Sequence, residues 1–156
     1  MTGIPAPAGA YQQMQAALQE ARHCLDSGDV PIGALVVDEA GQVLGRGYNR
    51  READQDPTAH AEILALRQAG QARGSWRLDD CTLVVTLEPC LMCAGALMLA
   101  RIQRLIFGAW EEKTGAVASR YDVLREGGKR QWVQVYPGVL EAESVQLLQD
   151  FFGQRR

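Results

Sequence analysis

Two pairs of side chains in this sequence could serve one metal ion. Cys90 and Cys93 are three residues apart, so on a helical turn both sulfurs lie on one face and can bind the same ion. Upstream, His60 and Glu62 supply an imidazole and a carboxylate at the start of an apolar-periodic segment. One histidine and two cysteines are three ligands of the type that zinc prefers, whereas a closed structural zinc site has four. The pattern indicates a zinc site with one open position.

The spacing constrains the elements that must carry these side chains. Residues two apart on a regular helix point away from each other, so His60 must precede the first regular turn if it and Glu62 serve one ion. This predicts a helix that begins near residue 60. Pro89 suits the first turn of a second helix, where its missing N–H is no loss. The N-terminus of that helix, at Cys90, would direct free N–H groups at the thiolates.

The open position defines the chemistry. Two thiolates neutralise the charge of Zn²⁺, so a bound water loses its proton less readily than one held by three imidazoles, and a nearby carboxylate is needed to accept it. Glu62 is the candidate. Such a site can attack an electron-poor carbon that bears an amine, releasing ammonia and leaving a carbonyl. H-x-E followed by P-C-x-x-C is the signature of zinc-dependent nucleobase deaminases. Either motif alone is weak evidence for this function, but the two together are strong evidence.

The hydropathy pattern predicts alternating strands and helices around these motifs. Helices are expected at residues 11–26, 61–72, 91–100 and 140–152, and strands at 34–37, 43–48, 82–86, 105–107 and 132–135. The first two strands form a hairpin, and the strand–helix–strand order over 82–107 implies parallel pairing through a right-handed crossover. We expect a loop at 50–57 and an irregular segment at 108–130 with one helical turn near 121–124. The result is a three-layer α/β/α domain with a mixed, five-stranded sheet.

Length and composition fit one soluble domain. The chain has 156 residues, of which 47% are hydrophobic and 22% charged. We expect a flexible leader at residues 1–10 and a single domain at 11–156. The leader lacks the features of a secretory signal, and the longest apolar run, 90–100, is too short to span a bilayer, which favours a cytoplasmic protein. Cys24 and Cys81 lie in apolar-periodic segments and are predicted to be plain buried thiols.

The charge is uneven along the chain. A net charge of −3 argues against a protein that coats nucleic acid indiscriminately, and no DNA partner is expected. Residues 1–100 carry seven basic and twelve acidic side chains, whereas residues 101–156 carry nine and seven. The basic C-terminal third could follow a phosphate backbone. On charge alone, a solvated surface is the better interpretation.

Longer blocks of sequence point to a family. Asp56–Ile63, Thr86–Ala96, Phe107–Ala109 and Lys113–Gly115 resemble the corresponding blocks of bacterial tRNA-specific adenosine deaminases, and the similarity runs in order from about Tyr11 to Phe152. The resemblance implies a cytidine deaminase-like fold. It also implies a homodimer with one Zn²⁺ per subunit, which converts the wobble adenosine to inosine in the anticodon stem-loop of an arginine tRNA. An anticodon loop offers bases that are already partly unstacked, so extruding one costs little.

The resemblance also implies roles for individual residues. It assigns zinc binding to His60, Cys90 and Cys93, the proton shuttle to Glu62, and substrate binding to Asn49, Ala61 and Glu111. Glu111 stands where many relatives have an aspartate near the target nucleotide. Without the resemblance, Asn49 would be interpreted as a turn residue. With an RNA substrate, the basic C-terminal third would bind phosphates around the pocket.

Other functions remain open at this point. The zinc residues do not select the base, so a deaminase of free cytosine, cytidine or guanine is the main alternative. A non-catalytic zinc-stabilised module would need a fourth ligand, for which His23, Cys24 and Cys81 are the candidates. A thiol-redox function is the weakest alternative, because it leaves His60 and Glu62 without a role.

Overall fold

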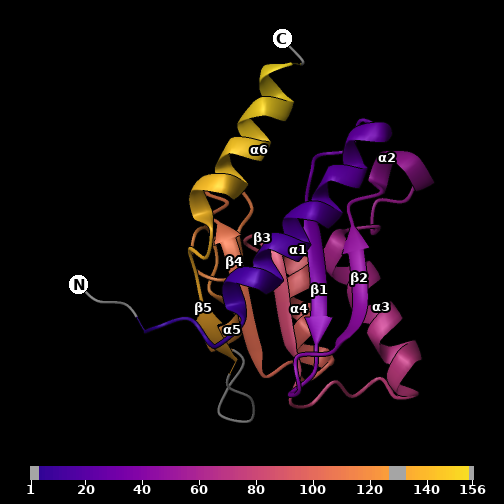
Figure 1. Ribbon diagram of the computed structural model, residues 1–156, viewed down its shortest axis with the longest axis vertical. Helices are drawn as coiled ribbons and strands as arrows, with labels where there is room; N and C mark the ends of the chain where they lie inside the picture. The colour runs from indigo at the N-terminus through magenta and orange to yellow at the C-terminus, as the bar shows by residue number, and fades with distance from the viewer. Residues whose placement is uncertain (1–3, 127–132, 155–156) are drawn as a thin grey trace.

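The computed structural model describes residues 4–126 and 133–154, which form one sheet between two layers of helices (Figure 1). The strands are β1 (Gly33–Val37), β2 (Val43–Tyr48), β3 (Thr82–Leu87), β4 (Arg104–Ala109) and β5 (Gln134–Tyr136). Their order in the sheet is β2-β1-β3-β4-β5. Strand β1 is antiparallel to β2 and β3, whereas β4 is parallel to β3 and β5. The predicted mixed, five-stranded sheet is confirmed, as are the hairpin and the parallel crossover.

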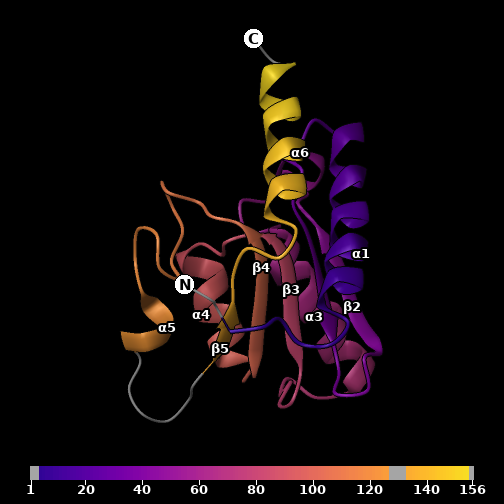
Figure 2. The same cartoon turned by 60° about the vertical axis from the view of Figure 1, so that its left-hand side comes forward.

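Helices cover both faces of this sheet (Figure 2). They are α1 (Ala10–Arg22), which continues as a 3₁₀ turn (His23–Asp26), α2 (Arg51–Asp54), α3 (Ala61–Arg73), α4 (Leu91–Leu99), α5 (Val123–Glu126) and α6 (Glu141–Gly153). Helices α1 and α6 lie on one face, and α3 and α4 lie on the other. The three-layer α/β/α prediction is therefore confirmed.

Two hydrophobic cores follow from this layering. Alternate residues of the central strands point to opposite faces. Leu83 and Val85 belong to the core under α3 and α4, whereas Val84 belongs to the core under α1. Both cores need apolar side chains, which is why the middle of each central strand is a continuous apolar run: Ala34–Val37 in β1, Leu83–Val85 in β3 and Leu105–Phe107 in β4.

Helix α3 lies unusually close to strand β2. A Cβ atom added to Gly47 would sit 2.2 Å from the carbonyl oxygen of Ala61, and one added to Gly45 would sit 2.2 Å from the carbonyl oxygen of Ala65. Real Cβ atoms do not approach other atoms so closely, so the two glycines permit the contact. The first turn of α3 is thereby held directly against the sheet.

Several predicted boundaries differ from the structure. The expected loop at 50–57 contains the short helix α2, the helical turn expected near 121–124 is α5 at 123–126, and the last strand begins at Gln134 rather than at 132. Pro89 is not in a helical first turn, because α4 begins at Leu91 with Cys90 as its N-cap. Residues 4–9 contain no helix or strand, and residues 1–3 and Trp132 lie outside the described part of the chain.

Across residues 4–126 and 133–154, no helix combines the length and the hydropathy needed to cross a bilayer.

Candidate active site

Two helix N-termini meet at one end of the sheet and bring the predicted ligands together. His60 is the N-cap of α3, so its backbone is extended and its side chain precedes the first regular turn. Cys90 is the N-cap of α4, and Cys93 lies one turn further along that helix. The predicted helix start at residue 60 is confirmed. The backbone N–H of Cys93, in the first turn of α4, donates to the sulfur of Cys90, where it favours the thiolate.

The distances between the three ligand atoms fit a zinc ion. The Nδ1 atom of His60 lies 3.7 Å from the sulfur of Cys90 and 3.6 Å from the sulfur of Cys93. Tetrahedral zinc with ordinary Zn–N and Zn–S bonds would separate these atoms by roughly 3.6 Å. The three atoms all lie within 4.8 Å of one another, and in the described residues no further ligand belongs to this group. The donors therefore suit zinc and supply three of its four positions.

The thiols of the chain fall into two classes. Hydrogen bonding from the Cys93 thiol, assisted by His60 and opposed by burial, lowers the pKa of Cys90 to about 3. Burial raises the pKa of Cys24 and that of Cys81 to about 11 each. Cys24 donates to the carbonyl oxygens of Ile32 and Asn49, and neither Cys24 nor Cys81 joins the ligand group. Their prediction as plain buried thiols is confirmed.

Glu62 lies in the first turn of α3, next to the ligand group, and its side chain is 5% exposed. Burial raises the pKa of Glu62 above its ordinary value. A buried carboxylate with a raised pKa can accept and return a proton more readily near neutral pH than an exposed one.

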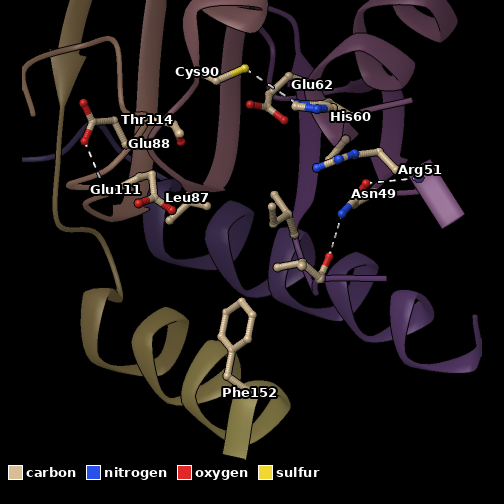
Figure 3. A pocket seen from close by; sticks show the side chains of 13 residues that line it. Asn49, Arg51, His60, Glu62, Leu87, Glu88, Cys90, Glu111, Thr114 and Phe152 are labelled. Atoms are coloured by element: carbon tan, nitrogen blue, oxygen red, sulfur yellow. Dashed lines mark hydrogen bonds between the residues drawn. The ribbon is translucent and has the colours of Figure 1, made fainter. Parts of the chain in front are cut away.

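A cavity of about 200 Å³ opens beside these residues (Figure 3). Its size is below the roughly 300–1,000 Å³ typical of pockets for drug-sized ligands, so it suits one small chemical group. His60, Ala61, Glu62 and Cys90 line one part of it. Asn49 and Arg51 lie to one side of these residues in Figure 3, and Glu88, Glu111 and Thr114 lie to the other. Phe152 of α6 contributes an aromatic ring to the lining.

The side-chain amide of Asn49 is hydrogen-bonded within the protein but keeps groups that could bind a ligand. Its amide nitrogen donates to the carbonyl oxygen of Val30 at 3.1 Å, and its side-chain oxygen accepts the Arg51 N–H at 3.2 Å. These bonds fix the amide, which is only 5% exposed and faces the cavity. A side-chain amide has two N–H donors and two acceptor lone pairs. One donor and one lone pair therefore remain for a ligand.

The structure brings together every predicted site residue. His60, Glu62, Cys90, Asn49, Ala61 and Glu111 line the cavity, and Cys93 completes the ligand group. Sequence reasoning missed Arg51, Glu88, Thr114 and Phe152. Glu88 and Thr114 lie inside the blocks that carry the family resemblance, which was the available signal. Arg51 was hidden in a segment interpreted as a connecting loop.

Two residues of the basic C-terminal third, Arg101 and Arg104, lie away from this cavity. Arg104 begins β4 and pairs with Thr82, the first residue of β3, whereas the cavity lies just beyond the last residue of β3. Six residues of strand span about 20 Å. Arg104 therefore lies at the opposite end of the sheet, close to Arg101, while Lys129, Arg130, Arg155 and Arg156 lie outside the described residues.

Comparisons with known proteins agree with this geometry. A family model described as MafB19-like deaminase matches residues 10–156. A tRNA-specific adenosine deaminase of Streptococcus pyogenes serotype M1 is 44% identical over 143 residues, which are 92% of this chain and 83% of that protein. A solved structure comes from a study of A-to-I editing by tRNA:A34 deaminases at the wobble position of tRNA. It matches this chain with a TM-score of 0.83 at 44% identity, and the match covers 88% of this chain and 99% of the chain in that structure.

A guanine deaminase from Nitrosomonas europaea is a more distant structural neighbour. Its TM-score is 0.77 at 24% identity, and the match covers 98% of this chain and 97% of that one. At this identity the likeness shows a shared fold.

Proposed function

This chain belongs to the family of tRNA-specific adenosine deaminases, and from that premise we propose that it hydrolyses the wobble adenosine of a tRNA anticodon to inosine. We include in the proposal one Zn²⁺ per subunit and an arginine tRNA as the substrate. The observation that best supports deamination is the ligand group with one open position beside a buried glutamate. The similarity to tRNA-specific adenosine deaminases supports the choice of substrate.

The reaction exchanges an amine for an oxygen. Water adds to C6 of adenine, the C6–N bond breaks, and inosine and ammonia are the products. Zinc held by His60, Cys90 and Cys93 would supply a Lewis acid that makes water a better nucleophile at neutral pH. Glu62 takes the proton from the attacking water and transfers it to the departing amine. Its burial suits this role, because a raised pKa makes the protonated form accessible during the cycle.

The walls of the cavity orient the base. The free donor and acceptor of Asn49 can hydrogen-bond to an edge of adenine. Ala61 is the first residue of α3, where backbone N–H groups have no acceptor within the helix. Glu111 lies on the opposite wall, and its carboxylate accepts the Lys113 N–H at 3.0 Å. We assign these three residues to substrate binding.

The test measures inosine directly. The purified protein is incubated with an anticodon stem-loop that carries adenosine at the wobble position and, separately, with free adenosine, cytidine, cytosine and guanine, and the products are identified by mass spectrometry. We expect inosine in the stem-loop at that position. Turnover of a free base or nucleoside without turnover of the stem-loop would instead support the main alternative function. Sequencing of total tRNA after exposure to the protein identifies the edited species.

We also infer a cytoplasmic homodimer. A tRNA substrate places the enzyme in the compartment where tRNA is used. Leu91 and Leu99 of α4 are 48% and 73% exposed, an apolar surface that a second copy of the chain can cover. Light scattering coupled to size-exclusion chromatography measures the oligomeric state.

A further inference from the structure

Glu88 is a buried carboxylate for which the deamination reaction provides no role. It follows the last residue of β3 and precedes Pro89 and Cys90, so it belongs to the turn that carries a metal ligand. It is 2% exposed. A buried carboxylate is costly unless hydrogen bonds compensate for the lost water.

The partners of Glu88 come from one segment, residues 111–119. Its Oε2 atom accepts the backbone N–H groups of Val117, Ala118 and Ser119 at 3.1, 2.9 and 3.0 Å. Its Oε1 atom accepts the Glu111 N–H at 3.0 Å and the Ser119 hydroxyl. Three successive N–H groups that converge on one oxygen form an anion-binding nest. Five donors occupy the carboxylate, so it has no lone pair to spare for a metal ion or a proton relay.

The segment also fits closely against the turn that it contacts. The Ala116 N–H donates to the carbonyl oxygen of Pro89 at 2.8 Å, next to Cys90. A Cβ atom added to Gly115 would lie 2.4 Å from the Glu88 carboxylate. Glu88 therefore joins the cysteine-bearing turn to a segment that supplies Glu111 and Thr114 to the cavity (Figure 3).

We propose that Glu88 is a positioning residue for the RNA substrate: it anchors segment 111–119 at the height at which Glu111 and Thr114 form the wall opposite Asn49. This deepens the proposed function and rests on it. The segment has no strand or α-helix of its own between β4 and α5, so the five hydrogen bonds replace a regular element as its support. The metal ligands and Glu62 lie at the N-termini of α3 and α4, outside segment 111–119, and none of them is a hydrogen-bond partner of Glu88.

Substitution with glutamine distinguishes the hydrogen bonds that Glu88 accepts from the space that its side chain fills. Glu88→Gln keeps the side chain's size but retains one acceptor oxygen in place of two. Whichever way the amide is oriented, its NH₂ group replaces an oxygen that accepted backbone N–H groups, so those N–H groups lose their acceptor. Glu112→Gln is the matched control, because it makes the same change on an exposed residue of the same segment.

The experiment measures kcat and KM on the wobble-adenosine stem-loop, zinc content, and hydrogen exchange of backbone amides. For Glu88→Gln we expect a KM about ten-fold higher, a kcat within about three-fold of the parent, and zinc at the parent level, since uniform substrate binding is lost and the reacting groups remain. Exchange should rise at residues 111–119 and stay unchanged in α3 and α4. Glu112→Gln should match the parent throughout. Glu88→Asp, which keeps both acceptors, should recover part of the loss in KM.

Other results would overturn the proposal. An unchanged KM with faster exchange at 111–119 would show that the wall does not position RNA. Loss of zinc would show instead that Glu88 supports the metal ligand Cys90 and does not act through the RNA substrate. If Glu88→Gln does not fold, Ser119→Ala decides, because it removes one donor and should raise KM in the same direction by a smaller factor; an unchanged KM there refutes the anchor. A parent protein that makes no inosine would refute the proposed function, a result distinct from these.

Discussion

Glu62 and the metal ligand His60 share one short stretch of chain but have separable tasks. His60 and Glu62 are neighbours on α3, yet only the imidazole belongs to the ligand group. Truncating the carboxylate should therefore leave the metal in place and remove the proton shuttle.

Glu62→Ala should keep its fold and zinc content and lose turnover by a factor of roughly 10²–10⁴, the usual contribution of a positioned general acid–base. Inosine formation, metal analysis and circular dichroism on the same sample measure the three properties. A variant that edits RNA at the parent rate would refute the role of Glu62, and one that loses its zinc would show that the carboxylate helps to hold the metal.

The thiols allow a second prediction, which concerns metal removal. After chelation, iodoacetamide at pH 8 should label Cys90 first, because its thiol is only half-buried and its pKa of about 3 leaves it a thiolate. Cys24 and Cys81 are buried with pKa values of about 11, so they should react only when the protein unfolds. Peptide mass spectrometry locates the label, and a sample in urea is the control. Rapid labelling of Cys24 in the folded protein would contradict the burial described here.

Helix α3 delivers His60 and Glu62, and glycines in its neighbour set its position. Gly45 and Gly47 lie on the same face of β2, where they admit the backbone of α3 at Ala61 and Ala65. Moving the first turn of α3 would move the histidine ligand and the carboxylate together.

Gly47→Ala should destabilise the protein by about 1–3 kcal/mol or more, because the new methyl group overlaps the Ala61 carbonyl. It should also lower zinc affinity, since His60 caps the displaced helix. Gly70→Ala is the matched control on α3: its Cβ would meet only the Ser75 oxygen at 3.4 Å, and the substitution should stabilise the helix by up to about 1 kcal/mol. Urea titration and metal-competition assays measure both effects. Equal stability of the two variants would show that α3 can shift without cost.

Local patterns predicted the elements that carry chemistry better than those that carry the cavity walls. The ligands were predictable because H-x-E and C-x-x-C need particular helix starts, and α3 and α4 begin where that geometry requires. Helix α2 was missed because it is four residues long and part of its support comes from Asp29, whose carboxylate accepts the Glu52 and Ala53 N–H groups from more than twenty residues away. The Glu88 anchor was missed for the same reason: its five donors come from a distant segment, and no local pattern records them.

The distribution of charge over the whole molecule determines how it can bind RNA. The chain has a net charge of −3, so attraction to phosphates must come from local groups. Arg51 lies at the cavity, with its side chain directed toward it in Figure 3, whereas Arg104 lies at the other end of the sheet. These two arginines provide a test of where the RNA backbone runs.

Arg51→Ala should raise KM for the stem-loop and reduce the slope of log(kcat/KM) against log[salt] by about 1, the change expected when one phosphate contact is lost. Arg104→Ala removes the same charge about 20 Å away and should leave both quantities unchanged. Kinetics at several salt concentrations measure the slopes. If Arg104→Ala has the larger effect, the RNA extends along the sheet toward the basic C-terminal third, and contacts away from the cavity contribute most of the affinity. If only Arg51→Ala has an effect, the anticodon loop is held chiefly at the cavity, so residues 49–51 and 111–119 together determine which base reaches Glu62.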